Sequence, residues 1–185
     1  LFFGAAQPVL ANYVPVLDHP VFLVGLMLFG AGVAFSGAMS VPGVMRQLKG
    51  GPAWHLGAAL SMMAALTALG AWVVAVATAG LPSTAARFEV LAWGPGHVLQ
   101  FVHVILLMSV WSLLGEQVLE REVMPAHWLR RLLWLAAVPL LAVPLIYFNS
   151  PTNSYEFRRA YTLLMSLGAW PAPAALAIHL LLQLK

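Results

Sequence analysis

Five long apolar segments, joined by short connections rich in glycine and proline, constrain this chain more than any other feature of its sequence. A helix needs about 20 apolar residues to cross the hydrocarbon core of a bilayer, and each segment is long enough. Only helices satisfy their own backbone polar groups within such a segment. We therefore predict an all-α, polytopic transmembrane bundle with spanning helices at about 20–41, 54–79, 96–118, 129–148 and 160–184.

The composition agrees with a membrane protein. Hydrophobic residues make up 62% of the chain and charged residues only 8%, whereas soluble domains carry about 25% charged residues. We expect one transmembrane domain over residues 1–185, as a piece of a longer chain. The net charge of +3 is modest and the basic residues lie in short connections, so nucleic acid is not an expected partner. The chain has no cysteine, which excludes disulfides and thiolate ligands.

Basic residues predict the orientation, because cytoplasmic connections carry an excess of lysine and arginine. Six of them fall on the side of the connections after the first and third helices, and three on the other side. We therefore expect the start of the chain outside and Lys185 in the cytoplasm, with His97 near the outer face. The six are Arg46, Lys49, Arg121, Arg130, Arg131 and Lys185, and the three are Arg87, Arg158 and Arg159.

Polar side chains at the head of the third segment are the best candidates for a functional site. His97, Gln100 and His103 follow one another at 60° intervals around a helix, which predicts a slanting polar ridge. The two histidines are about 9 Å apart along the axis, too far to bind one metal ion together at bonds of about 2 Å. A ridge of interhelical hydrogen bonds is the alternative interpretation. The other histidines favour capping, interfacial, packing or, for His127, solvated loop positions: His19, His55, His127 and His179.

The stretch "WGPGHVLQF", from Trp93 to Phe101, resembles the sixth transmembrane helix of the catalytic subunit of heme–copper oxidases. The C-type oxidases and the related nitric oxide reductases are the most similar in pattern. "YTLLMSLGAWPAP" also resembles the family segment that begins the eighth helix, so the five helices would match the fourth to the eighth. The resemblance implies that His97 is the metal-binding histidine, with Trp93, Gln100 and His103 lining the same cofactor pocket.

One departure from the family limits this implication. The family places two adjacent metal-binding histidines at the end of the next helix, where this chain reads Ile146-Tyr147-Phe148-Asn149. A lone imidazole makes a poor copper site, so we do not expect copper or reduction of dioxygen. The family's heme ligands lie on the second and tenth helices, beyond this sequence, which is compatible with a bound heme.

The resemblance thus predicts a membrane-integral subunit of a respiratory or related redox complex, as an electron-transfer, heme-binding or scaffold part of an oxidoreductase. Its expected partners are the lipid bilayer, other membrane subunits and a cytochrome c-type electron carrier, in a bacterial inner (cytoplasmic) membrane. The alternative is a non-enzymatic assembly or structural subunit that packs through the ridge of His97, Gln100 and His103.

Prolines 139, 144, 171 and 173 indicate either irregular packing or room for a cofactor.

Overall fold

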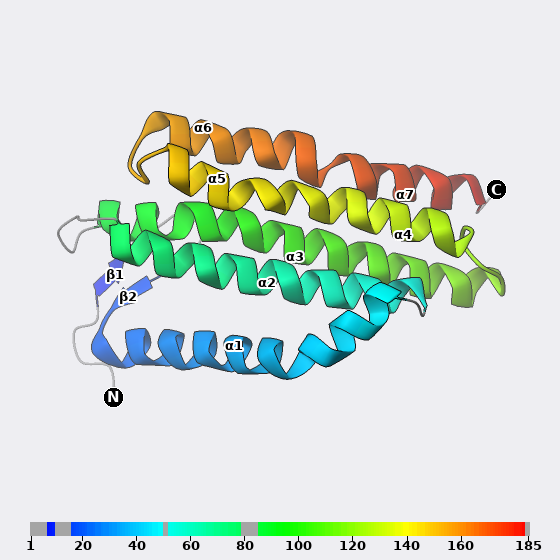
Figure 1. Cartoon of the computed structure of the whole chain (residues 1–185), viewed down its shortest axis with the longest axis horizontal. Helices are drawn as coiled ribbons and strands as arrows, with labels where there is room; N and C mark the ends of the chain where they lie inside the picture. The colour runs from blue at the N-terminus through cyan, green and yellow to red at the C-terminus, as the bar shows by residue number, and fades with distance from the viewer. Residues whose placement is uncertain (1–6, 10–15, 50–51, 79–84, 184–185) are drawn as a thin grey trace.

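The computed structural model describes residues 7–9, 16–49, 52–78 and 85–183, and helices make up most of it (Figure 1). A short antiparallel pair of strands, β1 (Gln7–Val9) and β2 (Val16–Asp18), precedes the helices. The helices are α1 (Pro20–Lys49), α2 (Ala53–Thr78), α3 (Ala85–Leu119), α4 (Ala126–Ala137), η1 (Val138–Leu141), α5 (Ala142–Asn149), α6 (Tyr155–Leu163), η2 (Leu164–Ala169) and α7 (Pro171–Gln183).

Five helical stretches in the described part of the chain are long and apolar enough to cross a membrane. This confirms the predicted helical, membrane-spanning class, and large apolar side chains on the outside of the bundle indicate contact with lipid. The fourth stretch joins α4, η1 and α5, and the fifth joins α6, η2 and α7. The stretches are Pro20–Ser40, Ala53–Thr78, Arg87–Leu119, Ala126–Asn149 and Tyr155–Gln183.

Several predicted helix boundaries were wrong because glycine and proline do not end these helices. α1 continues through Pro42 to Lys49, although we expected it to end at residue 41. α3 begins at Ala85 and contains Pro95, although we expected it to begin at Gly96. Membrane helices tolerate such residues because neighbouring helices compensate for the lost backbone hydrogen bonds. The predicted ends at 79 and 184, the connection "GLPST" and Lys185 lie outside the described residues.

The fourth and fifth spans also begin earlier than expected, at Ala126 instead of 129 and at Tyr155 instead of 160. The second difference has a local cause in Ser154. Its side chain accepts a hydrogen bond of 3.1 Å from the backbone N–H of Phe157, and Glu156 lies in the first turn. A serine cap and an acidic first turn both stabilise a helix start.

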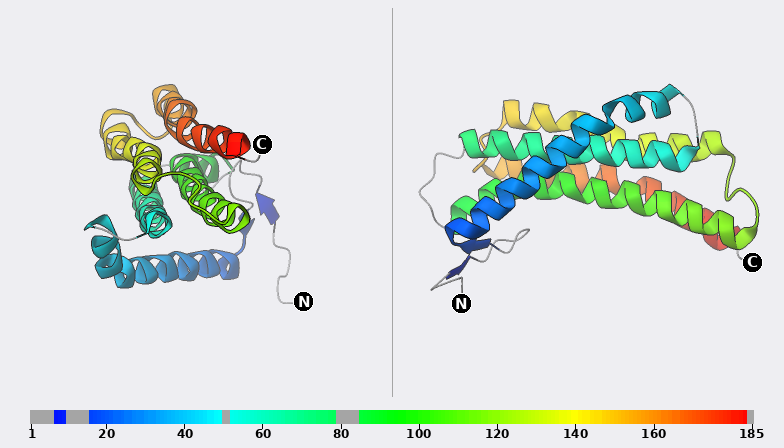
Figure 2. Two further views of the ribbon diagram at one scale, coloured as in Figure 1. Left: turned by 90° about the vertical axis from the view of Figure 1, so that its right-hand side faces the viewer. Right: turned by 90° about the horizontal axis from the view of Figure 1, so that it is seen from below.

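α2 and α3 form the most extensive helix pair in the bundle. The buried face of α2 repeats every three or four residues and consists mostly of small side chains, which allow the helices to approach closely. A Cβ on Gly57 would collide with Ser109 of α3. α1 packs mainly on α2 and lies at an angle across the other helices (Figure 2). The small buried residues of α2 are Ala53, Gly57, Ala59, Ser61, Ala64, Ala68, Ala71 and Ala75.

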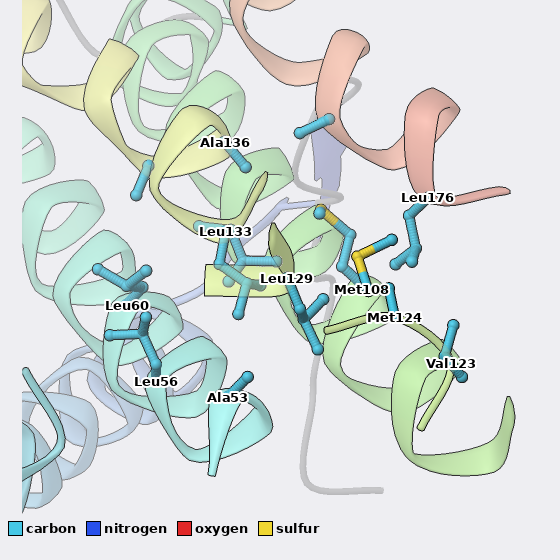
Figure 3. Packing of buried hydrophobic residues seen from close by; sticks show 13 residues of the cluster. Ala53, Leu56, Leu60, Met108, Val123, Met124, Leu129, Leu133, Ala136 and Leu176 are labelled. Carbon is cyan, nitrogen blue, oxygen red and sulfur yellow. The ribbon is translucent and has the colours of Figure 1, made fainter. Parts of the chain in front are cut away.

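The bundle core has one larger cluster toward the beginning of α4 and another toward the beginning of α6. In the first, Leu56 and Leu60 of α2 pack with Leu133 of α4 and Met108 of α3 (Figure 3). All four are almost fully buried. The second cluster contains Phe101, Phe157 and Tyr161, among others, and borders the candidate site described below.

The irregular parts of the fourth and fifth spans fit against each other. Pro139 lies within η1, a 3₁₀ turn, and Gly168 lies within η2, which is a π-helical segment. A Cβ on Gly168 would lie 2.7 Å from Cβ of Pro139. The irregular turn at Pro139 therefore packs closely against Gly168 of the neighbouring span. Irregular packing was one of the two interpretations of the prolines that the sequence allowed.

Candidate functional site

His97 lies inside the bundle, with only 5% of its surface exposed. Its position is ten residues beyond Arg87, where the third span begins, or about 15 Å along the helix axis. α3 begins eleven residues earlier than predicted, so His97 lies within the helix and not at its start. Buried polar groups in a membrane bundle are costly, so they mark candidate functional positions.

The backbone of α3 holds the His97 ring in one orientation. Its Nδ1 lies 2.6 Å from the carbonyl oxygen of Trp93, one turn earlier. Because a carbonyl oxygen only accepts hydrogen bonds, Nδ1 carries the proton in this contact. Nε2 is therefore the ring nitrogen whose lone pair can bind a metal ion or accept a proton.

Aromatic side chains from three spans surround His97. The ring of Trp93 lies 4.9 Å and that of Tyr161 5.5 Å from the imidazole, between ring centroids. Tyr161 in turn contacts Phe157 at 5.0 Å and Tyr147 at 6.2 Å. These five residues, contributed by α3, α5 and α6, are called the aromatic cluster below.

The tyrosine hydroxyls of the aromatic cluster are its most unusual polar groups. Both are buried, and neither has a hydrogen-bond partner of good geometry among the described residues. The two hydroxyls are nevertheless close enough to interact with each other. A buried hydroxyl normally has a partner, because leaving it without one costs about 1–3 kcal/mol. The two hydroxyls therefore have hydrogen-bonding capacity that their surroundings do not use in good geometry.

Gly94 allows Tyr147 to reach the cluster. A Cβ at this position would collide with the Tyr147 hydroxyl and would lie 3.2 Å from Cζ of Phe157. The absence of a side chain on α3 thus makes room for the end of the Tyr147 ring. This close approach gives a structural reason for the glycine before Pro95 in the "WGPGH" motif.

An ion pair lies beside the aromatic cluster, nearer the end of the bundle. The guanidinium of Arg158 is 3.2 Å from a carboxylate oxygen of Glu89 and 5.0 Å from the centre of the Trp93 ring. Their side chains are 40% and 30% exposed, so the pair contributes at most about 1 kcal/mol to stability. The ion pair links the start of α6 to the start of α3. It also places the positive charge of Arg158 over the face of the Trp93 ring.

Of the four predicted pocket residues, the structure brings only Trp93 and His97 together in the aromatic cluster. Gln100 is half-buried and His103 is exposed on the outside of the bundle. Both line a groove of about 360 Å³ between α3 and the η2–α7 segment. The slanting ridge thus crosses from the interior of the bundle to its surface.

Two of the other histidines, His19 and His179, make local hydrogen bonds. Nδ1 of His19 accepts a hydrogen bond of 3.2 Å from the N–H of Val21 and so caps the start of α1. The Nε2 atom of His179 lies 2.8 Å from the carbonyl oxygen of Val123, which ties α7 to the connection before α4. These contacts agree with the capping and packing roles expected for His19 and His179.

Sequence reasoning did not assign Tyr161, Phe157 or Arg158 to the site. Tyr161 and Phe157 are fully buried, and they come from the fifth span, more than 50 residues after His97. The available signal was their spacing: Phe157 and Tyr161 are four residues apart and share a helix face. That spacing could identify a buried face, but not the helix against which it packs.

The side chains at the site do not match the copper-binding set that the resemblance implies. His97 offers one imidazole nitrogen beyond its contact with the Trp93 carbonyl oxygen, and the rings beside it are those of Trp93 and Tyr161. No group of three or more histidine, cysteine, aspartate or glutamate side chains is placed for metal binding within the described ranges. A copper centre of the family's type therefore does not fit these residues.

Comparison with known proteins gives one informative relative. A protein of Aquifex aeolicus (strain VF5), described as uncharacterized, is 31% identical over 153 residues, which cover 79% of this chain. These residues cover 35% of the relative, so the chain spans about a third of its length. No protein family model matches the chain, and no solved structure matches it.

Proposed function

We propose that this chain is part of a membrane-integral subunit of a respiratory or related redox complex, similar in scaffold to the catalytic subunit of heme–copper oxidases. The observation that carries the proposal is the burial of His97, the histidine of the "WGPGH" motif, among Trp93, Tyr147 and Tyr161. A histidine held inside a membrane bundle beside buried hydroxyls is more costly than an apolar residue, and function is the usual compensation.

The position of Tyr147 supports the alignment behind this proposal. Tyr147 and Phe148 occupy the place of the family's two adjacent histidines. Tyr147 is a member of the aromatic cluster, through its contact with Tyr161. Phe148, in contrast, is 89% exposed. One of the two replaced positions therefore contacts Tyr161, whose ring lies beside that of the motif histidine.

The role we propose is heme binding, electron transfer or support of a redox centre, without reduction of dioxygen. A heme bound by helices outside this sequence would supply one-electron chemistry. This chain's own residues then bury His97 among aromatic rings and offer hydrogen bonds from Tyr147 and Tyr161. Nε2 of His97 can accept a proton there, while Nδ1 stays bound to the Trp93 carbonyl oxygen.

The proposed setting is a bacterial inner membrane, with other membrane subunits and a cytochrome c-type electron carrier as partners. Arg46, Arg121, Arg130 and Arg131 fall where α1 and α3 end and α4 begins, which is one end of the bundle (Figure 1). The positive-inside rule supports a cytoplasmic location for that end. The end that carries the Glu89–Arg158 pair then faces outward.

Spectroscopy of the full-length protein purified from its own membranes tests the proposal. We expect heme absorbance that changes on reduction, together with iron detected by elemental analysis. His97→Ala should perturb the spectrum, whereas the matched variant His103→Ala should leave it unchanged because His103 lies outside the aromatic cluster. A colourless protein without heme or metal would refute the redox role.

The alternative, a non-enzymatic assembly subunit, is favoured by one specific observation. Gln100 and His103 lie on the outside of the bundle, in the groove beside α7, where they can contact another protein. Under this alternative, His97→Ala leaves the spectrum unchanged and mainly lowers stability. The assembly role would then depend on two of the three ridge residues.

A further inference from the structure

The start of α4 carries an exposed arginine between two exposed tryptophans. Trp128, Arg131 and Trp134 follow one another at intervals of three residues, or 60° around the helix, so they form a slanting ridge. Trp128 is 51% and Trp134 39% exposed, and Arg131 is exposed as well. Tryptophans of membrane proteins concentrate where hydrocarbon meets the lipid headgroups. The ridge therefore indicates that level on the outside of α4.

The length of the fourth span places Arg131 close to the edge of the hydrocarbon. Its 24 residues, from Ala126 to Asn149, extend about 36 Å, which exceeds a hydrocarbon core of about 30 Å by about 6 Å. Arg131 lies five residues into the span, about 8 Å along the axis. Because a charge in hydrocarbon is costly, an arginine at this depth must extend toward the headgroups or bind an anion.

The side chain of Arg131 extends toward the start of the helix, and so toward the headgroups. Its Cζ lies 4.7 Å from the centre of the Trp128 ring, one turn earlier, in the direction that helical side chains favour. This cation–π contact holds the guanidinium in place. Among the described residues, no carboxylate oxygen lies within 4.0 Å of Arg131, and the Trp128 ring is its contact. The N–H donors of the guanidinium can therefore bind an anion.

The neighbouring Arg130 is placed differently. It is half-buried and interacts within the chain, whereas Arg131 is exposed. Deeper in the membrane, the side of α4 that carries Arg131 is apolar. Leu135 and Val138, four and seven residues further on, are each 51% exposed and lie on nearly the same side of the helix. A positive group at the hydrocarbon edge, followed by an apolar strip, is complementary to a phospholipid.

We propose that an anionic phospholipid binds at this ridge, with its phosphate on the Arg131 guanidinium and an acyl chain along Leu135 and Val138. A planar guanidinium can bind a phosphate through two parallel N–H···O bonds. Two adjacent arginines also attract a lipid with net negative charge.

A lipid is a better partner for this arginine than another protein segment. Phospholipid carries its phosphate at the depth that the Arg131 side chain reaches, and its acyl chain covers the apolar strip at no further cost. A protein segment would have to carry a carboxylate to the hydrocarbon edge, where such a group is itself costly. This inference concerns the outer side of α4 and does not depend on the role proposed for His97.

Native mass spectrometry of delipidated full-length protein tests the site, with phosphatidylglycerol and phosphatidylcholine of the same acyl chains as probes. The first phosphatidylglycerol should bind more tightly than phosphatidylcholine. Arg131→Gln should weaken its binding about tenfold or more, the effect of losing hydrogen bonds to a charged group. Arg131→Lys should recover only part of this loss, because lysine keeps the charge but not the planar fork.

Arg130→Gln is the matched control, because it removes the same charge one residue away. It should weaken phosphatidylglycerol binding by less than about threefold, which is below 1 kcal/mol. Equal losses for the two glutamine variants would show attraction by net charge alone and would overturn the proposal. Equal binding of the two lipids to the unaltered protein would also overturn it, as expected if another part of the protein or a partner covers Arg131.

A photoactivatable phosphatidylglycerol, with its reactive group on the acyl chain, locates the site in vesicles of the full-length protein. Cross-links should concentrate near Leu135 and Val138. Arg131→Gln should reduce them, whereas Arg130→Gln should not. The corresponding phosphatidylcholine should label this part of α4 less. Cross-links spread evenly over the exposed apolar residues, or unchanged in Arg131→Gln, would contradict the proposal.

Discussion

Replacing Gly94 with alanine tests the packing of the candidate site most directly. The added Cβ would collide with the Tyr147 hydroxyl and approach Cζ of Tyr147 and Cζ of Phe157 to 3.2 Å each. Phe157 is fully buried and cannot withdraw, so the Tyr147 ring must move. Overpacking of this kind costs about 1–3 kcal/mol, whereas an unhindered glycine-to-alanine change in a helix is favourable by up to about 1 kcal/mol. We expect a net loss of about 1–2 kcal/mol.

The free energy of unfolding can be measured by titrating the purified protein from mild detergent into SDS while following its helicity. Gly70→Ala is the matched control, because nothing lies within 4 Å of a Cβ at that position of α2. That variant should be neutral or slightly stabilised.

A double-mutant cycle identifies the cause of the loss at Gly94. Tyr147→Phe alone should be nearly neutral, because it removes a buried hydroxyl that lacks a well-aligned partner. Combined with Gly94→Ala it should restore about 1 kcal/mol or more, since the colliding atom is gone. If Gly94→Ala is equally destabilising with tyrosine or phenylalanine at position 147, the proposed contact between α3 and α5 is wrong.

Two further predictions concern helix packing and helix capping. Gly57→Ala should lower the free energy of unfolding by about 1–3 kcal/mol because its Cβ would collide with Ser109; Gly57→Ala/Ser109→Gly should regain part of this loss in the same SDS titration. Ser154→Ala should cost about 0.5–2 kcal/mol because the start of α6 loses its cap; hydrogen exchange should be faster in the first turn of α6 but unchanged in α2.

Hydrophobic length predicted the number and type of the membrane segments, because the apolar thickness of a bilayer leaves few alternatives to a helix of about 20 residues. Helix ends were predicted less well. Proline often ends a helix because it lacks a backbone N–H and its ring clashes with the preceding turn, and glycine because ordering it costs more backbone entropy. The rule failed at Pro42 and Pro95. In both cases the helix continues through the proline, as membrane helices can.

The aromatic cluster could be predicted only in part, because it depends on contacts between distant segments. The motif identified Trp93 and His97, which are local to one helix. Tyr147 could be recognised only as a departure from the family, and its closeness to Tyr161 required the packing of α5 against α6. Gly94 was visible only as a glycine of the "WGPGH" motif, and its effect is to leave space for a side chain from another helix.

The ridge of His97, Gln100 and His103 shows why helical geometry alone could not choose between a cofactor pocket and an assembly surface. The three residues cover 120° of the helix circumference, so one edge of the ridge can face the interior while the other faces outward. α2, α5 and α6 cover the His97 edge, and the groove beside α7 leaves the His103 edge exposed. The two interpretations therefore concern different residues of one ridge. A pocket at His97 and an interface at Gln100 and His103 can be present in the same molecule.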